Sequence, residues 1–263
     1  MRLKCRQFKA LFFYDLSNGF QRNQWKWLFA LLLQIYYCIL AGNTGVLGRF
    51  TSLFEGQYEL QLSTQWLTFH GFLLFLVNFY PVNELTYNGG QAIIRSGRKE
   101  YWLFSKMMWI ISTVISYYLL LVLVLVIGSV FTGSFSISPD VMMEIFEIDI
   151  TGLNLTKIIL YWWGMPLLVS IALCITEAIL SLFIQPVISL FIMFAYLIAS
   201  AYCMNPAFLG NYAMLKRQDF TSGVLSISPQ NCLISCMLLM IIAVTAGTLC
   251  FKRKDTFQLQ GGE

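Results

Sequence analysis

Polar side chains are rare within the long apolar runs of this sequence, and three of them are candidates for chemistry. They are Gln34, Asn78 and Glu177. An ionisable group such as Glu177 costs at least about 2.5 kcal/mol at membrane depth, so it marks function by default. Glu177 lies near one end of its run, where it could reach water or pair with a nearby basic side chain, so a structural or partner-contact role is favoured over proton or substrate handling. Gln34 and Asn78 are more typical of hydrogen bonds between helices than of ligand sites.

The sequence gives little support to metal or nucleotide chemistry. His70 is the only histidine, so metal ligation would require cysteines gathered from distant segments. A phosphate loop has the pattern G-x-x-x-x-G-K-[ST]. Here six residues separate Gly90 from Gly97, and Arg98 stands before Lys99. We therefore expect no catalytic residue, no metal and no cofactor in this chain.

The elements that carry these residues follow from the composition. Of 263 residues, 58% are hydrophobic and 11% are charged, whereas a soluble domain has about 25% charged residues. This is too little charge to coat a soluble surface, so we expect lipid to surround much of the chain. The net charge of +4 is small and its basic residues lie in short stretches beside apolar runs, which argues against nucleic-acid binding.

The sequence predicts an all-α, polytopic membrane protein with six transmembrane helices. A membrane helix needs about 20 largely apolar residues, since every backbone amide must be bonded within its own segment. The six runs cover about 25–41, 66–82, 102–131, 158–180, 182–202 and 232–251. The fourth and fifth runs are almost continuous and are interrupted only by Gln185-Pro186, where proline favours a tight turn. A single long broken helix is the alternative.

Basic residues set the expected orientation. They gather before the first run, between the second and third, and after the sixth. The loops on the opposite side carry only Arg49, Lys216 and Arg217, with Lys157 at a boundary. The positive-inside rule therefore places both termini in the cytoplasm. We expect one domain over 1–263, with an interfacial helix at 1–24, a membrane bundle at 25–251 and a cytoplasmic tail at 252–263.

Two further patterns concern the membrane interface. Phe8, Leu11, Phe12 and Leu16 recur at helical spacing and predict an amphipathic amino-terminal helix, which Asn18-Gly19 would end; a basic tail without a helix is the alternative. Aromatic residues cluster near the run ends, where we expect them to anchor the protein at the headgroups. These are Trp25, Trp27, Trp66, Trp102, Tyr161, Trp162 and Trp163.

Together these features resemble the membrane subunits of ABC-2-type ABC transporters, in particular small six-span bacterial members. The resemblance rests on the amino-terminal helix, the six runs and three stretches of sequence. These stretches are Arg95-Ser96-Gly97-Arg98-Lys99 leading into Trp102 and Ser105-Lys106, the loop from Asn205 to Arg217, and Lys252-Arg253-Lys254-Asp255. The resemblance covers nearly the whole chain, although much of it is topology.

The resemblance implies a permease half in a bacterial plasma membrane. Its partners would be cytoplasmic ABC ATPase subunits, which bind ATP and Mg²⁺, a second permease subunit in a homo- or heterodimer, and membrane lipid. In that family the amino-terminal helix and the first cytoplasmic loop contact the ATPase, which nominates 83–101 as the coupling segment. Its candidate contacts are Arg95, Gly97, Arg98, Lys99 and Glu100.

The resemblance also implies short re-entrant helices in the external loop between the fifth and sixth spans. The matching residues are Pro206, Asn211, Tyr212, Lys216 and Arg217. The expected function is export of a lipophilic or peptide substrate, for example in resistance or immunity to antimicrobial peptides. The alternatives are a non-transporting scaffold or immunity protein that binds a toxin directly, and an intramembrane enzyme, for which we identify no nucleophile with a base and no pair of aspartates at membrane depth.

Overall fold

The computed structural model describes residues 2–56, 60–86, 99–134, 139–221 and 225–253, and its regular elements are helices. The elements are α1 (Arg2–Arg22), α2 (Gln24–Leu40), α3 (Gly45–Phe54), α4 (Leu60–Glu84), α6 (Lys99–Thr132), α7 (Pro139–Phe146), α8 (Leu155–Ile159), the π-helix η2 (Leu160–Gly164), α9 (Met165–Ser181), α10 (Pro186–Tyr202), the 3₁₀ helices η3 (Leu209–Ala213) and η4 (Leu215–Arg217), and α11 (Pro229–Arg253). The expected all-α class is confirmed.

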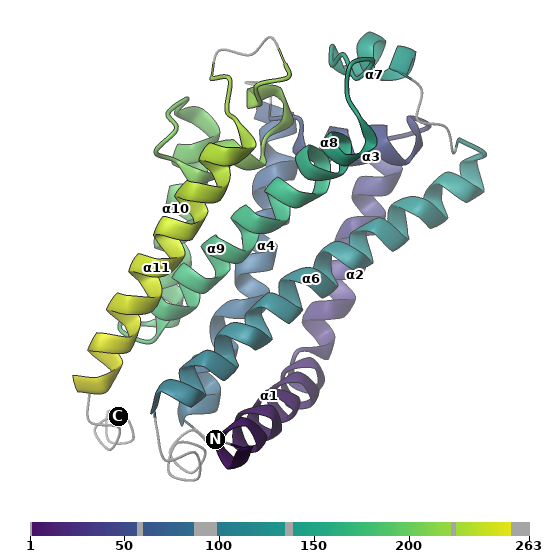
Figure 1. Cartoon of the computed structure of the whole chain (residues 1–263). Helices are drawn as coiled ribbons and strands as arrows, with labels where there is room; N and C mark the ends of the chain where they lie inside the picture. The colour runs from purple at the N-terminus through teal and green to yellow at the C-terminus, as the bar shows by residue number, and fades with distance from the viewer. Residues whose placement is uncertain (1, 57–59, 87–98, 135–138, 222–224, 254–263) are drawn as a thin grey trace.

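The long helices α2, α4, α6, α9, α10 and α11 run along a bundle (Figure 1). In this bundle α9 packs against α4, α6, α10 and α11. α1 packs on α6 at the end of the bundle where α11 also ends, while α3, α7 and η3 lie at the opposite end. The two ends of the described chain therefore share one end of the bundle.

Several helices are long and apolar enough to cross a membrane. Among the described residues three single helices meet this condition, namely 99–132, 155–181 and 229–249. The pair α2 and α3 makes a fourth if the two count as one span bent by 110°, and α10 is a shorter apolar helix. These helices indicate a multi-pass membrane protein, but they do not establish the six spans expected from the sequence.

The bend between α2 and α3 comes from glycines. Gly42 and Gly45 have φ angles of 62° and 75°, a left-handed backbone that costs glycine little because it has no Cβ. The first apolar run was expected to end near residue 41, and α2 ends at Leu40. The sequence reading missed α3, which turns back toward the bundle after these glycines.

The turn expected at Gln185-Pro186 is confirmed. α9 ends at Ser181, and α10 begins with Pro186 in its first turn. Proline suits this position, since its φ is already helical and its missing N–H would have no partner there. α9 and α10 then pack against each other, so the alternative of one broken helix is wrong.

The amino-terminal helix is confirmed, but the expected break at Asn18-Gly19 is wrong. α1 continues to Arg22. Gly19 is buried, and a Cβ at this position would lie 2.2 Å from Trp109 Nε1 of α6. Glycine therefore serves a close helix contact here instead of ending the helix.

The expectation that aromatic residues anchor the protein at the interface is only partly correct. Trp25 is 75% exposed, as an anchor requires, but Trp66 and Trp102 have no exposed surface and Trp162 is also buried. Trp162 Nε1 donates a hydrogen bond to Thr51 Oγ1 at 2.8 Å, and Tyr161 is likewise buried. These rings belong to the core because a buried indole or phenol fills a large volume, and the polar atoms of Trp102, Trp162 and Tyr161 find hydrogen-bond partners there.

Candidate functional site

Buried charged side chains meet where α1, α4 and α6 come together, and we call this group the ion cluster. Its charged members are Asp15 of α1, Glu84 of α4 and Lys106 of α6. Asp15 and Glu84 are each 1% exposed, and Lys106 is 3% exposed. Charges this deeply buried are stable only when they are paired and hydrogen-bonded, so the three helices depend on one another at this point.

Asp15 has a complete set of partners in the ion cluster. Lys106 Nζ donates a hydrogen bond to Asp15 Oδ1. Tyr80 OH donates to the same oxygen at 3.0 Å, and Ser105 Oγ donates to Asp15 Oδ2. These donors belong to α4 and α6, so Asp15 fastens α1 to both helices.

Glu84 is held by two residues of α6. Lys106 Nζ lies 3.2 Å from Glu84 Oε2, and Trp102 Nε1 donates a hydrogen bond to that oxygen at 2.6 Å. Trp102 and Lys106 share one face of α6 because they are four residues apart. The Trp102 ring also stacks on Phe251 of α11, with centroids 5.4 Å apart, so the ion cluster reaches a fourth helix.

The ion cluster adjoins the coupling segment expected from the sequence. Three of the expected ATPase contacts, Arg95, Gly97 and Arg98, lie outside the described residues. The other two, Lys99 and Glu100, form the first turn of α6. Glu84 is the last residue of α4, and Lys106 lies in the second turn of α6. The helices at the two ends of the coupling segment therefore both take part in the ion cluster.

Gln34 and Asn78 each donate a hydrogen bond to the backbone of another helix. Gln34 Nε2 donates to Tyr117 O at 3.1 Å, which joins α2 to α6. Asn78 Nδ2 donates to Pro186 O at 2.7 Å, which joins α4 to the start of α10. Both side chains are fully buried, so in this state each serves helix packing.

Glu177 has no exposed surface, so the expectation that it could reach water is wrong. Ser189 Oγ donates to Glu177 Oε1 at 3.1 Å. Lys26 of α2 lies close enough to Glu177 to interact with it electrostatically, and its Nζ donates to Phe75 O at 2.9 Å. Ser189 Oγ and the Asn78 amide also share Pro186 O, so two of the residues singled out from the sequence lie in one polar group.

Arg217 caps the end of α10 and is 1% exposed. Its Nη1 donates to Ser200 O at 2.7 Å and its Nη2 donates to Ala201 O at 2.6 Å. Its Nη1 also donates to Asn211 Oδ1. The last carbonyls of a helix have no partner within the helix and carry partial negative charge. The guanidinium of Arg217 donates hydrogen bonds to these carbonyls and offsets their charge.

The remaining residues singled out between α10 and α11 lie on or beside short 3₁₀ helices. Tyr212 is buried with its OH 3.2 Å from Ser235 Oγ, and Pro206 is exposed. Lys216 Nζ lies 2.8 Å from Glu55 Oε1. The loop thus packs against α11 and the end of α3, and the short helices η3 and η4 lie within the stretch in which short re-entrant helices were expected.

Arg49 resembles Arg217 in its surroundings. It is 3% exposed, its Nε donates to Gly42 O at 2.9 Å, and its Nη2 donates to Thr132 Oγ1 at 2.8 Å. Arg49 therefore closes the end of α2 and ties it to the end of α6. Both arginines counted as external in the orientation argument are buried structural groups.

Sequence reasoning missed the ion cluster as a site. Lys106 contributed to the family resemblance and not to a site, Asp15 lies within the segment expected to be an interfacial helix, and Glu84 lies within the expected coupling segment. One signal was present, since Lys106 follows the start of an apolar run and an ionisable residue in such a run marks a buried partner.

Comparisons of the chain with known protein families, curated proteins and solved structures find no match.

Proposed function

We propose that this chain is the permease subunit of an ATP-driven transporter of the ABC-2 type. In this proposal α2, α4, α6, 155–181, α10 and α11 cross a bacterial plasma membrane, with both termini in the cytoplasm. The start of α1 and the end of α11 share one end of the bundle, which is compatible with six crossings. ATP and Mg²⁺ would be bound by separate cytoplasmic subunits, and a second permease subunit would complete the pathway.

The observation that carries the proposal is the ion cluster beside the coupling segment. A subunit that pulls on 83–101 acts directly on the end of α4 and the start of α6. Because Asp15, Glu84 and Lys106 lock these ends to α1, the three helices would move together. Substrate export follows when this joint movement changes access to a route between the helices.

The substrate class in this proposal is lipophilic or peptidic. The exposed side chains of the long helices are chiefly large and apolar, for example Phe29, Phe191 and Ile241, which suits a substrate that partitions into lipid. Peptide antibiotics belong to this class, so resistance or immunity to such a peptide is the biological role that we propose.

Co-purification with ATPase subunits tests this function. Full-length tagged chain, expressed from its own gene neighbourhood and extracted in mild detergent, is expected to bring down an ABC ATPase and to show ATP hydrolysis. Reversing the charge of Arg95, Arg98 and Lys99 together should remove the ATPase from the complex. Reversing Lys157, an exposed basic residue at the opposite end of the bundle, should leave it bound.

Two outcomes would count against the proposal. If the complex contains no ATPase, or if the charge-reversed variant retains the ATPase and transports normally, the transporter assignment is wrong. Capture of a toxin by the chain alone would then favour the immunity-protein alternative.

A further inference from the structure

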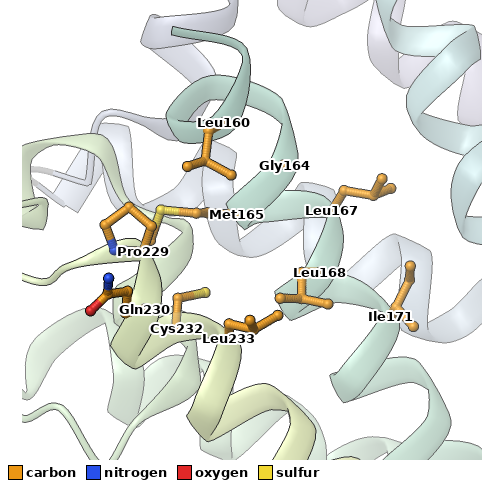
Figure 2. A pocket seen from close by; sticks show the side chains of 10 residues that line it. All are labelled: Leu160, Gly164, Met165, Leu167, Leu168, Ile171, Pro229, Gln230, Cys232 and Leu233. Atoms are coloured by element: carbon orange, nitrogen blue, oxygen red, sulfur yellow. The ribbon is translucent and has the colours of Figure 1, made fainter. Parts of the chain in front are cut away.

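An apolar groove lies between η2 and α9 on one side and the start of α11 on the other (Figure 2). Its volume is about 400 Å³. Leu160, Gly164 and Leu168 contribute from the first side, and Cys232 and Leu233 from the second. The groove is distant from the ion cluster, since η2 and the start of α11 lie at the opposite end of the bundle.

Local backbone structure creates this hollow. η2 is a single π-helical turn within the continuous run 155–181, and π-turns widen a helix and often occur at functional sites. Gly164 in this turn adds no side chain to the hollow. A Cβ there would already lie 3.2 Å from Leu160 Cδ1, so glycine keeps the upper part of the groove open.

The groove faces lipid if the long helices cross a membrane. Its walls belong to two of the three single helices that are long and apolar enough to span. Only 22% of the apolar window of α11 is buried, against 56% for 155–181. Leu233 at the groove is 53% exposed, and Leu238 farther along α11 is 59% exposed, so the hollow opens onto a continuous apolar face.

The shape and charge of the groove indicate its occupant. Leu160 and Ile171 both line it, and helix rise separates them by about 16 Å along the axis, so the groove is elongated in the direction in which lipid tails run. Lys157 lies one turn before Leu160 on the same helix face, and it is exposed. Gln230 supplies a polar amide at the rim. An apolar groove whose lining begins one helical turn from a lysine matches one acyl chain and the anionic headgroup of the same lipid.

We propose that this groove between η2, α9 and α11 binds an acyl chain of an anionic phospholipid whose phosphate contacts Lys157. The preference for this lipid arises chiefly from the headgroup. An acyl chain that enters the groove comes from lipid that is equally apolar, so its transfer contributes little to the free energy of binding. Lys157 distinguishes anionic from zwitterionic headgroups, because a basic residue at the membrane surface attracts anionic lipid.

Photo-crosslinking in nanodiscs tests this proposal on the full-length chain. The probes are phosphatidylglycerol and phosphatidylcholine that carry the same diazirine-labelled acyl chain. With phosphatidylglycerol we expect adducts concentrated in peptides that contain 160–171 and 229–233. Lys157→Gln should reduce the preference for phosphatidylglycerol about fivefold, as expected for one basic residue near a membrane surface.

Groove-filling variants provide the matched comparison. Leu168→Trp should lose most of the adduct in the groove peptides, whereas Leu238→Trp, outside the groove on the exposed face of α11, should retain it. If Leu168→Trp does not elute as a monodisperse species, Gly164→Leu fills the same space. The proposal is overturned by adducts spread evenly over exposed α6 residues such as Leu123, by equal labelling with both lipids, or by a dimer cross-linked through the groove.

Discussion

The two ends of the bundle bury charge in different ways. At the end where α1 lies, Lys106 meets two carboxylates that come from separate helices. At the other end, Arg49 and Arg217 donate mainly to backbone carbonyls at helix ends and to neighbouring polar groups. The first arrangement depends on the relative positions of three whole helices, whereas the second acts at helix ends, where Arg217 caps α10 and Arg49 joins the end of α2 to the end of α6. A movement between helices would therefore disturb the first end much more than the second.

The largest effect is expected from breaking the ion cluster on one side. Lys106→Met leaves Asp15 and Glu84 buried without a cation, and loss of one partner of a buried pair costs about 3–5 kcal/mol. Chemical unfolding in mixed micelles should show this loss in the free energy of unfolding. The triple variant Lys106→Met, Asp15→Asn, Glu84→Gln removes every charge and should recover part of it. If the triple variant is less stable than Lys106→Met, the charge account of the ion cluster is wrong.

A smaller effect is expected from opening the cap on α10. Arg217→Ala leaves the carbonyls of Ser200 and Ala201 without their donor, and a lost hydrogen bond from a charged group costs about 1.5–3 kcal/mol. Arg217→Lys should recover only part of the loss, because an ammonium group cannot reproduce the planar fork of the guanidinium. Equal stability of the alanine and lysine variants would contradict the capping geometry. The same denaturation measurement allows direct comparison with the ion cluster.

The contact of α1 with α6 should be less costly to disturb. Gly19→Ala places a methyl group against the Trp109 ring, and overpacking of this kind costs about 1–3 kcal/mol. Limited proteolysis should show faster release of α1 in the variant. Gly152→Ala is the control, since a Cβ there would meet no atom within 4 Å. If both variants behave as the parent protein does, α1 does not depend on this close approach.

The smallest effect concerns two carboxylates that face one lysine. Glu147 is 82% exposed and lies 3.7 Å from Lys216, so Glu147→Gln should change the free energy of unfolding by less than about 0.5 kcal/mol. Glu55 is 5% exposed and lies 2.8 Å from the same Nζ. Glu55→Gln should therefore cost more, since a short buried pair is less screened by solvent. A reversed order would show that burial does not control the strength of this contact.

The sequence predicted most of the long helices because their signal is local. Apolar runs and a proline turn identified α2, α6 and α10 to within a few residues of their ends. Gly19 was wrongly expected to end the amino-terminal helix, and α3 was not predicted. A glycine can end a helix or allow a neighbouring ring to approach closely, and only tertiary contacts distinguish these two cases. The ion cluster was missed for a similar reason. Asp15 and Lys106 are 91 residues apart, and their pairing depends on helix packing that no local pattern encodes.

The length of α6 sets the depth at which the ion cluster lies. Its 34 residues make a rod of about 50 Å at about 1.5 Å per residue. The hydrocarbon layer is about 30 Å thick, and helix tilts rarely exceed about 40°, so even a strongly inclined rod extends into the headgroup zone. Lys106 is in the second turn from one end of this rod. A rise of about 10 Å separates Lys106 from that end, so an upright, centred rod would hold the lysine and its two acids at the edge of the hydrocarbon layer, next to the zone that a soluble protein can reach.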